Sequence, residues 1–212
     1  MATRKWEGIA DVLVVDVPGI EWPAAQLALV RAARRFYEQS LAWREVCAPL
    51  YTAQGIADYD MLDIPHAEVV ALREVFIGTQ EICPDEIITP ADLRRLAMER
   101  PGQGVPRHAS WDAGMLWLYP TPAQSGVRIT ATLALRPTHN APGLPAQQWD
   151  DHIDAIVLGA REILHRSPGK PWTSPDDAMM CGAQFKQAID DWQIKARLLG
   201  TDAQRRVTAH WI

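Results

Sequence analysis

The sequence has few cysteines, no long apolar run and no excess of basic residues, and each shortage excludes a class of protein. Cys47, Cys83 and Cys181 are far apart and form no Cys-x-x-Cys pair, so they predict reduced, mostly buried thiols rather than a disulfide framework or a zinc cluster. No apolar stretch approaches the roughly 18 residues that a membrane-spanning helix needs. The formal net charge of −5 argues against a dedicated nucleic-acid-binding protein, which usually has a basic domain.

The sequence also lacks the motifs of catalysis. No serine lies in a Gly-x-Ser-x-Gly elbow and no histidine in a His-Glu-x-x-His pair. Gly169-Lys170 lacks the first glycine and the following Ser or Thr of a phosphate-binding loop. In Asp150-Asp151-His152-Ile153-Asp154 the histidine points away from the face that Asp150 and Asp154 share on a helix, which favours a solvated acidic helix start over a metal site. We therefore predict no enzyme activity, no catalytic residue, no cofactor and no metal.

Amphipathic helices account for both ends of the chain, whose 48% hydrophobic and 22% charged residues are typical of a globular protein. A helix of about 20 residues is expected to start at Pro23, because proline suits a first helical turn. Its apolar stripe is Leu29, Phe36 and Trp43, spaced by seven residues. Two more helices are predicted, one over about 146–166 and one from a Ser174 cap to Gly200.

The middle of the chain has shorter segments that end at glycine or proline. Residues 69–77 and 80–82 predict a hairpin with Gly78-Thr79 at its tip. A short helix is expected over 90–99, with Thr89 as its cap. Residues 115–119 and 127–135 read as two strands that pair as a second antiparallel hairpin.

These elements predict a mainly α fold: a bundle of three main helices with an inserted small antiparallel β module and an extended C-terminal tail. We expect one domain over 1–200, helical over 20–46 and 145–200 and β-rich over 48–140. The tail is then 201–212.

Two features are candidates for binding. Arg31, Arg34 and Arg35 form a basic cluster on the first helix, for which ion pairs are a better interpretation than DNA phosphates because Glu38 follows one turn later. The tail ends in Trp211-Ile212, and such an apolar pair either folds back onto its own domain or docks on a partner.

The ends of the chain carry a resemblance to a known family. In the C-terminal third it rests on Trp149, the small pair Gly159-Ala160, the stretch 168–172 and Phe185; in the N-terminal third it rests on 36–44. In these segments the chain resembles the head-to-tail adaptor (connector or head-completion) proteins of tailed bacteriophages.

The resemblance implies a structural virion protein without enzyme activity. Such a protein forms a ring, commonly of twelve copies, that binds the portal protein and the tail or nozzle proteins and continues the channel through which DNA is ejected. It would lie at the head–tail junction of a particle assembled in the host cytoplasm, with DNA only passing through and no membrane involved. A ring subunit needs two lateral faces, and the apolar residues that lie off the helices' core stripes are Leu27, Val30, Leu158 and Ile194.

The resemblance also implies that the tail reaches the portal, which would make Arg205, Arg206, Trp211 and Ile212 the portal-binding residues. Three alternatives stay open. The chain could be a tail-tube or other tail structural protein of similar fold, a small hydrolase with a site built from loops, or a DNA-binding module that uses the arginine cluster.

Overall fold

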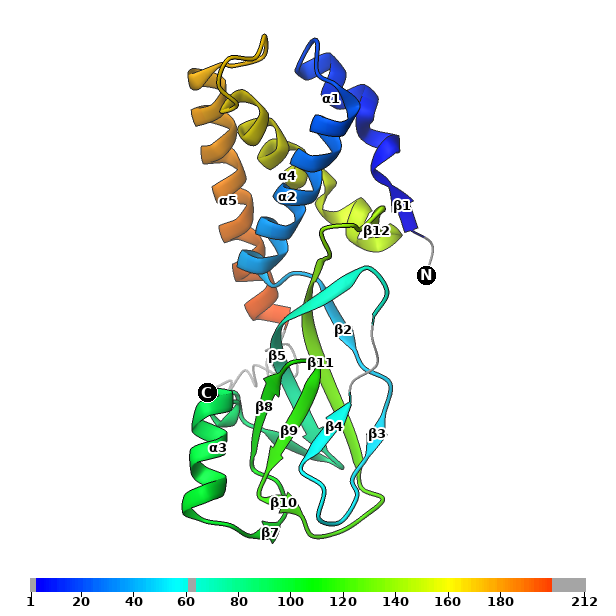
Figure 1. The fold of residues 1–212 in the computed structure, drawn as a ribbon, viewed down its shortest axis with the longest axis vertical. Coiled ribbons are helices and arrows are strands. Elements are labelled where there is room, and N and C mark those ends of the chain that lie inside the picture. Colours follow the sequence, from blue (N-terminus) through cyan, green and yellow to red (C-terminus); the bar gives the residue numbers. More distant parts are fainter. Residues whose placement is uncertain (1–2, 61–63, 200–212) are drawn as a thin grey trace, which may run out of the picture. The chain divides into compact units, whose positions relative to one another are not determined.

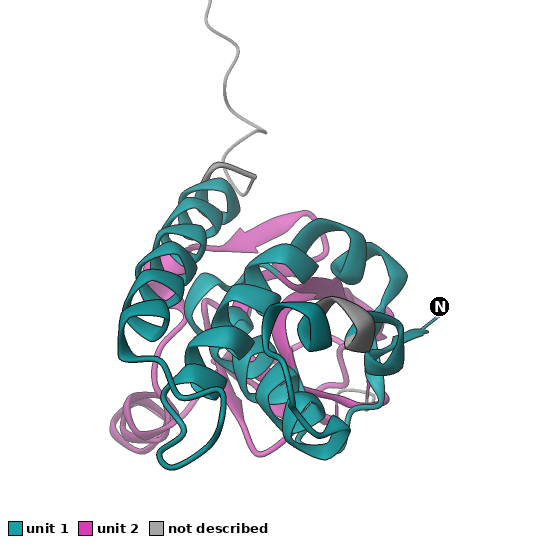
Figure 2. Cartoon of the chain, turned by 90° about the horizontal axis from the view of Figure 1, so that it is seen from above, with its two compact units in different colours: residues 1–42, 137–212 teal, residues 43–136 magenta. Residues whose placement is uncertain are grey.

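The computed structural model describes residues 3–60 and 64–199, and its contacts divide the chain into two compact units. Residues 1–42 and 137–212 make the first, which we call the helical unit, and residues 43–136 make the second, the β unit (Figures 1 and 2). The predicted single domain over 1–200, with a tail at 201–212, stays a prediction.

The helical unit is built on α-helices that the chain supplies from both of its ends. Its described helices are η1 (Trp6–Ile9, a 3-10 helix), α1 (Ala10–Asp16), α2 (Trp22–Ser40), α4 (Ala146–His165) and α5 (Pro175–Leu199). Two short antiparallel strands, β1 (Thr3–Lys5) and β12 (Gly143–Pro145), join the start of the chain to the segment that leads into α4.

Local sequence explains where these helices begin and end. Pro23 lies in the first turn of α2, as predicted, and the N–H of Asp177 donates to Ser174 Oγ over 3.4 Å at the start of α5. The end of α2 comes earlier than predicted because Leu41 takes a left-handed conformation, with φ 54°. Trp43, the expected last member of the apolar stripe, therefore lies beyond the helix and is buried in the β unit.

The β unit contains one larger sheet and two smaller ones. The five-stranded antiparallel sheet has the order β2 (Arg44–Val46), β11 (Arg128–Pro137), β5 (Ala67–Ile77) and β6 (Gln80–Ile82), and β3 (Leu50–Tyr51) also pairs with β11. A three-stranded sheet has the order β4 (Asp58–Asp60), β9 (Met115–Tyr119) and β8 (His108–Asp112). The remaining elements are the parallel pair β7 (Gln103–Gly104) and β10 (Thr121–Pro122), the 3-10 helix η2 (Pro84–Glu86) and the helix α3 (Pro90–Glu99).

The expected mainly α fold is wrong, because the structure is 44% helix and 28% strand and belongs to the mixed α/β class. Strands β2, β3 and β4 are only two or three residues long, which is too short for an alternating pattern to show in the sequence. They form because longer neighbours offer backbone partners, as in the pairs Leu133 with Glu45 and Leu116 with Tyr59. The β part is therefore no small module.

The two predicted hairpins have different outcomes. The first is confirmed: Ile77 pairs with Gln80 across Gly78, whose φ is +66°. The second is wrong, because β9 pairs with β8 and β4 while β11 lies in the other sheet. Strands β8 and β9 are joined by a two-residue turn, Ala113-Gly114, with φ values of 49° and 90°. Positive φ at both turn positions suits the right-handed twist of a hairpin.

Helix α3 is confirmed together with its cap, since the N–H of Asp92 donates to Thr89 Oγ1 over 3.2 Å. The expectation of mostly buried thiols is wrong: Cys181 is buried, Cys47 is half-buried and Cys83 is exposed. Cys83 lies in the turn before η2, where its N–H donates to Glu86. Within residues 3–60 and 64–199, none of the helices has the length and apolar character needed to cross a membrane.

The core of the helical unit is centred on Phe185 of α5, which is fully buried. Its ring lies directly on α4 at Gly159, where an added Cβ would stand only 2.7 to 2.9 Å from ring carbons. From α2, Phe36 packs with its ring centroid 6.4 Å from that of Phe185, and the Arg35 guanidinium lies 5.3 Å from the Phe185 centroid. The three long helices therefore meet at one aromatic side chain.

Replacing Gly159 tests this packing. Alanine favours a helix over glycine by about 1 kcal/mol, but overpacking a closed core costs about 1–3 kcal/mol. We expect Gly159→Ala to lower the free energy of unfolding, as measured by chemical denaturation. In the double variant Gly159→Ala with Phe185→Leu, the decrease in this free energy should be smaller than the sum of the decreases in the two single variants.

Gly8→Ala is the matched control, because a Cβ there meets nothing within 4 Å, and its stability should stay near that of the wild type. A Gly159→Ala protein at least as stable as the wild type would contradict the proposed packing.

Candidate functional site

A buried polar cluster lies where α2, α4 and α5 meet, around His152. His152 Nδ1 is 3.0 Å from the Gln148 carbonyl oxygen and 3.1 Å from Tyr37 Oη. The imidazole also packs edge-on against Trp192 with 4.3 Å between ring centroids. Burial lowers the pKa of His152 and raises the pKa of Tyr37 well above its usual value. Both side chains are therefore neutral near pH 7, and their role is to hold the helices together.

The acidic segment around His152 is divided between surface and core. Asp150 is exposed and forms an ion pair with Arg4 at 2.7 Å, whereas His152 points inward. The two residues thus leave the helix in different directions, as the helical period predicts. In the part of the chain that the structure describes, no group of three or more His, Cys, Asp or Glu side chains could hold a metal ion.

A second buried polar group is the carboxylate of Glu162 in α4. Its Oε2 is 3.1 Å from Arg35 of α2 and its Oε1 is 2.9 Å from Arg166. Gly182 of α5 leaves room for it, because a Cβ there would lie 3.0 Å from the Glu162 Cδ. A buried carboxylate needs such partners to offset its lost hydration.

The arginine cluster on α2 is largely engaged inside the fold. Arg34 is buried and donates to the carbonyl of Pro137 over 2.6 Å, and Arg35 pairs with Glu162. Arg31 is exposed. Arg35 is therefore in an ion pair, as expected, but its partner is Glu162 of α4 and not Glu38 on its own helix.

The pH dependence of stability tests the neutral His152. Burial is the main cause of its lowered pKa, helped by Lys195 and opposed by the Gln148 carbonyl and Asp151. The folded pKa lies below the unfolded value of about 6.5, so the unfolded state binds the proton more readily and stability is lost as the pH falls below about 6.5. We expect the melting temperature to drop between pH 7.5 and 5.5, and His152→Gln, although less stable overall, to show a smaller drop.

His139, which is exposed, supplies the control: His139→Gln should keep the pH dependence of the wild type. Equal drops for His152→Gln and the wild type would show that His152 does not carry the effect.

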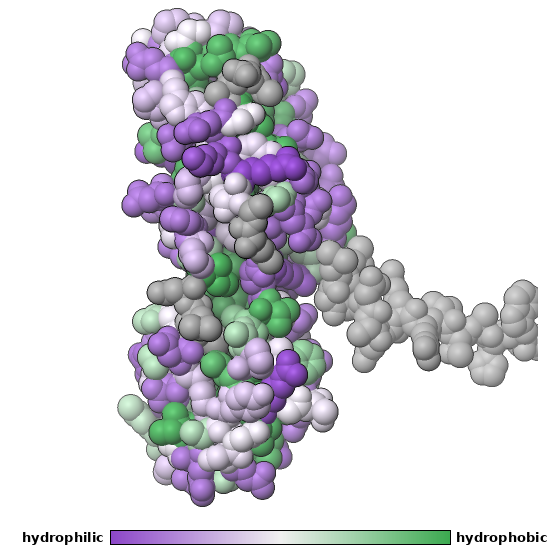
Figure 3. Space-filling model, turned by 90° about the vertical axis from the view of Figure 1, so that its right-hand side faces the viewer, coloured by the Kyte–Doolittle hydropathy of each residue, from purple (hydrophilic) through white to green (hydrophobic). Residues whose placement is uncertain are grey.

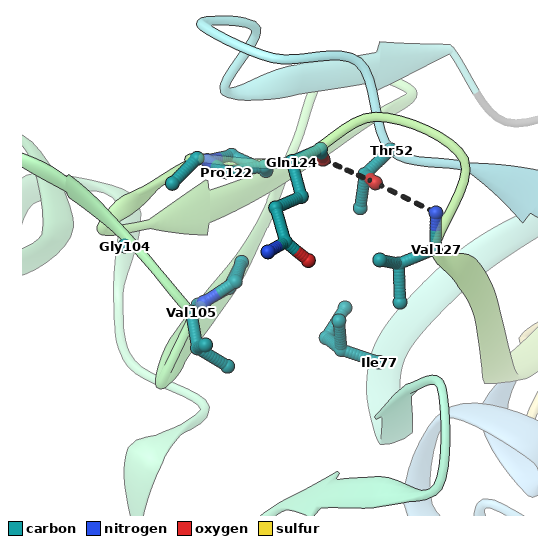
Figure 4. A pocket seen from close by; sticks show the side chains of 9 residues that line it. Thr52, Ile77, Gly104, Val105, Pro122, Gln124 and Val127 are labelled. Carbon is teal, nitrogen blue, oxygen red and sulfur yellow. Dashed lines mark hydrogen bonds between the residues drawn. The ribbon is translucent and has the colours of Figure 1, made fainter.

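A hollow of about 340 Å³ lies in the β unit, between β5, β7 and β10. The side chains of Ile77, Val105 and Val127 turn toward the same space (Figure 4). At its rim the Thr52 hydroxyl donates to the Gln124 carbonyl over 2.7 Å and accepts from the Val127 N–H at 3.0 Å. The described side chains that line it include no acid or base, and the hydroxyl of Thr52 is already in two hydrogen bonds to the backbone. The hollow can therefore receive an apolar group.

Exposed apolar side chains are the remaining candidates for a functional surface. On the helical unit they are Val14, Val15, Leu27, Met179, Met180 and Ile194. Figure 3 looks onto the side that carries α1 and shows hydrophobic atoms among predominantly hydrophilic ones there. Exposed apolar groups on helices that already have a buried face favour contacts with other proteins.

A comparison with known families indicates the kind of protein to which these surfaces belong. A family model described as SU10 adaptor protein matches residues 7–208. The chain belongs to the SU10 adaptor protein family. It is thus a phage head–tail adaptor, a structural protein of the virion that binds other virion proteins. No curated protein matches the chain.

Sequence reasoning about the adaptor's surfaces was partly right. Of the four apolar residues expected to lie off the core stripes, Leu27 and Ile194 are 51% and 57% exposed, Leu158 is half-buried and Val30 is buried. The predicted portal-binding residues are Arg205, Arg206, Trp211 and Ile212, which all lie outside the described residues.

The start of the chain is part of the core, which was not predicted from the sequence. Trp6 is fully buried, its indole N–H donates to the Ala141 carbonyl over 2.9 Å, and its ring packs on Trp149 with centroids 5.8 Å apart. The tryptophan near the start of the chain could have indicated this role, because large aromatic side chains are usually buried in a core or an interface.

Proposed function

We propose that the adaptor forms a ring of twelve copies that joins the portal to the tail or nozzle proteins. The ring continues the channel through which DNA leaves the head, and DNA passes through it without being held. The family match supports this proposal, because the matched residues cover nearly the whole chain. The net charge of −5 fits a channel that repels phosphate.

The exposed residues of the helical unit support a ring. A ring is built from heterologous contacts, in which one patch of a subunit meets a different patch of the next. Leu27 of α2 and Ile194 of α5 lie on different helices and are both largely exposed. Such exposed apolar positions are available for contacts with neighbouring subunits.

The tail is proposed as the anchor on the portal. Trp211 and Ile212 would insert into an apolar pocket, and Arg205 and Arg206 would pair with acidic portal residues. Tryptophan and arginine are the residue types that most often dominate protein–protein interfaces. A short segment that orders on binding also suits a contact formed late in assembly.

The mass of the adaptor, alone and mixed with the portal protein of the same phage, tests this function. Analytical ultracentrifugation should give a 23.7 kDa monomer alone and a complex that contains about twelve adaptor copies with the portal. Many weak lateral contacts need a template that raises their effective concentration. An adaptor lacking residues 201–212 should fold as the wild type does but lose most of its portal binding.

Two results would count against the proposal. If the wild-type adaptor stays monomeric when it is mixed with the portal, the proposed ring on the portal is wrong. A shortened adaptor that binds the portal as tightly as the full chain would reject the anchor and leave the ring in place.

A further inference from the structure

The chain passes from the helical unit into the β unit and back again, so two backbone connections join the units. The first joins Ala42 to Trp43 and the second joins Arg136 to Pro137. Pro137 ends β11, and residues 138–145 then lead back to the start of α4. We call residues 138–145 the return connection.

The return connection has little regular structure of its own. Only its last three residues form a strand, β12, and near its beginning the Ala141 N–H donates to the Thr138 carbonyl over 3.2 Å. Just before it, the buried Arg34 of α2 donates to the Pro137 carbonyl over 2.6 Å, and towards its end Leu144 is fully buried. The residues between these two attachments need further partners to stay in place.

The start of the chain supplies these partners. The indole N–H of Trp6 donates to the Ala141 carbonyl over 2.9 Å, and the backbone N–H of Trp6 donates to the Pro142 carbonyl over 3.2 Å. Immediately before Trp6, strand β1 lies beside β12 and pairs with it residue by residue (Figure 1). Residues 3–6, which we call the clamp, therefore contact the return connection from Ala141 to Pro145.

The clamp fits most closely at Gly143. A Cβ at this position would lie 1.8 Å from the Arg4 carbonyl oxygen and 2.8 Å from the Lys5 Cα. Both are backbone atoms, which cannot turn aside as the end of a long side chain can. Glycine is the residue that allows such a close approach of two backbones. One methyl group at position 143 would therefore displace the clamp without changing any of its side chains.

Most of the clamp lies on the surface. Thr3, Arg4 and Lys5 are exposed, and the Arg4–Asp150 ion pair leaves 52% and 53% of the two side chains exposed. Ion pairs of this kind contribute little to stability. Trp6 is the one buried residue of the clamp. Opening the clamp therefore exposes one large side chain, whereas the contact of α2, α4 and α5 around Phe185 lies elsewhere in the unit.

We propose that residues 3–6 are a clamp that can open while α2, α4 and α5 stay folded, and that its opening frees residues 138–143. When it is closed, the clamp fixes the path by which the chain enters α4. When it is open, the freed residues become a tether of up to about 20 Å, because an extended chain spans about 3.3–3.6 Å per residue. The clamp is thus a conformational device at one of the two connections between the units, and it does not rest on the proposed ring.

Relaxation measurements by nuclear magnetic resonance on the full chain, with Gly143→Ala, test the clamp. In the wild type the backbone order parameters of Ala141 and Gly143 should be near the value of about 0.85 that is typical of a rigid backbone. In the variant both positions should fall below about 0.6, together with residues 3–5, while α4 and α5 keep their values. Trp6→Phe keeps a buried ring but lacks the indole N–H, and it should lower the order parameter of Ala141 less.

Gly8→Ala is the matched control, because a Cβ there meets nothing within 4 Å, and its order parameters should equal those of the wild type. Three results would overturn the inference. In Gly143→Ala the clamp could stay rigid, or it could loosen while Ala141 keeps its order. If α4 and α5 lose their order as well, the clamp cannot be separated from the core, and the inference is wrong.

Discussion

The arrangement of the helical unit depends on one reciprocal contact between α4 and α5. Gly159 of α4 receives the ring of Phe185, and three residues further along each helix, in opposite directions, Gly182 of α5 receives Glu162. Both contacts keep the same antiparallel register, so a shift of either helix would drive a large side chain into backbone. Helix α2 joins through Arg35, which reaches both the Phe185 ring and the Glu162 carboxylate.

The buried polar residues of the unit have partners within the same packing. Glu162 is held by Arg35 and Arg166, and His152 is held by Gln148 and Tyr37. Buried polar groups with fixed partners specify one arrangement of the helices. The surface of the unit is predominantly hydrophilic but also carries exposed apolar side chains. These side chains are candidates for the contacts that an adaptor makes with other virion proteins.

The sequence predicted the elements that local chemistry determines. Prolines and caps placed the starts of α2, α3 and α5, and Gly78 placed one hairpin. Long-range pairing could not be predicted from the sequence, because β2 and β4 have no pattern of their own. No residue near Gly143 indicates that a Cβ at this position would lie 1.8 Å from the Arg4 carbonyl oxygen. The binding of the tail to the portal is proposed from composition and resemblance alone.

We propose that copies of this chain pack side by side as a ring between the head and the tail. Electron microscopy of head–tail junctions isolated from virions measures this most directly, at a resolution that traces α2, α4 and α5. We expect a closed ring of this chain directly beneath the portal, with each helical unit in contact with two neighbours. Finding the chain along the tail tube, or as single copies with no contact between helical units, would contradict it.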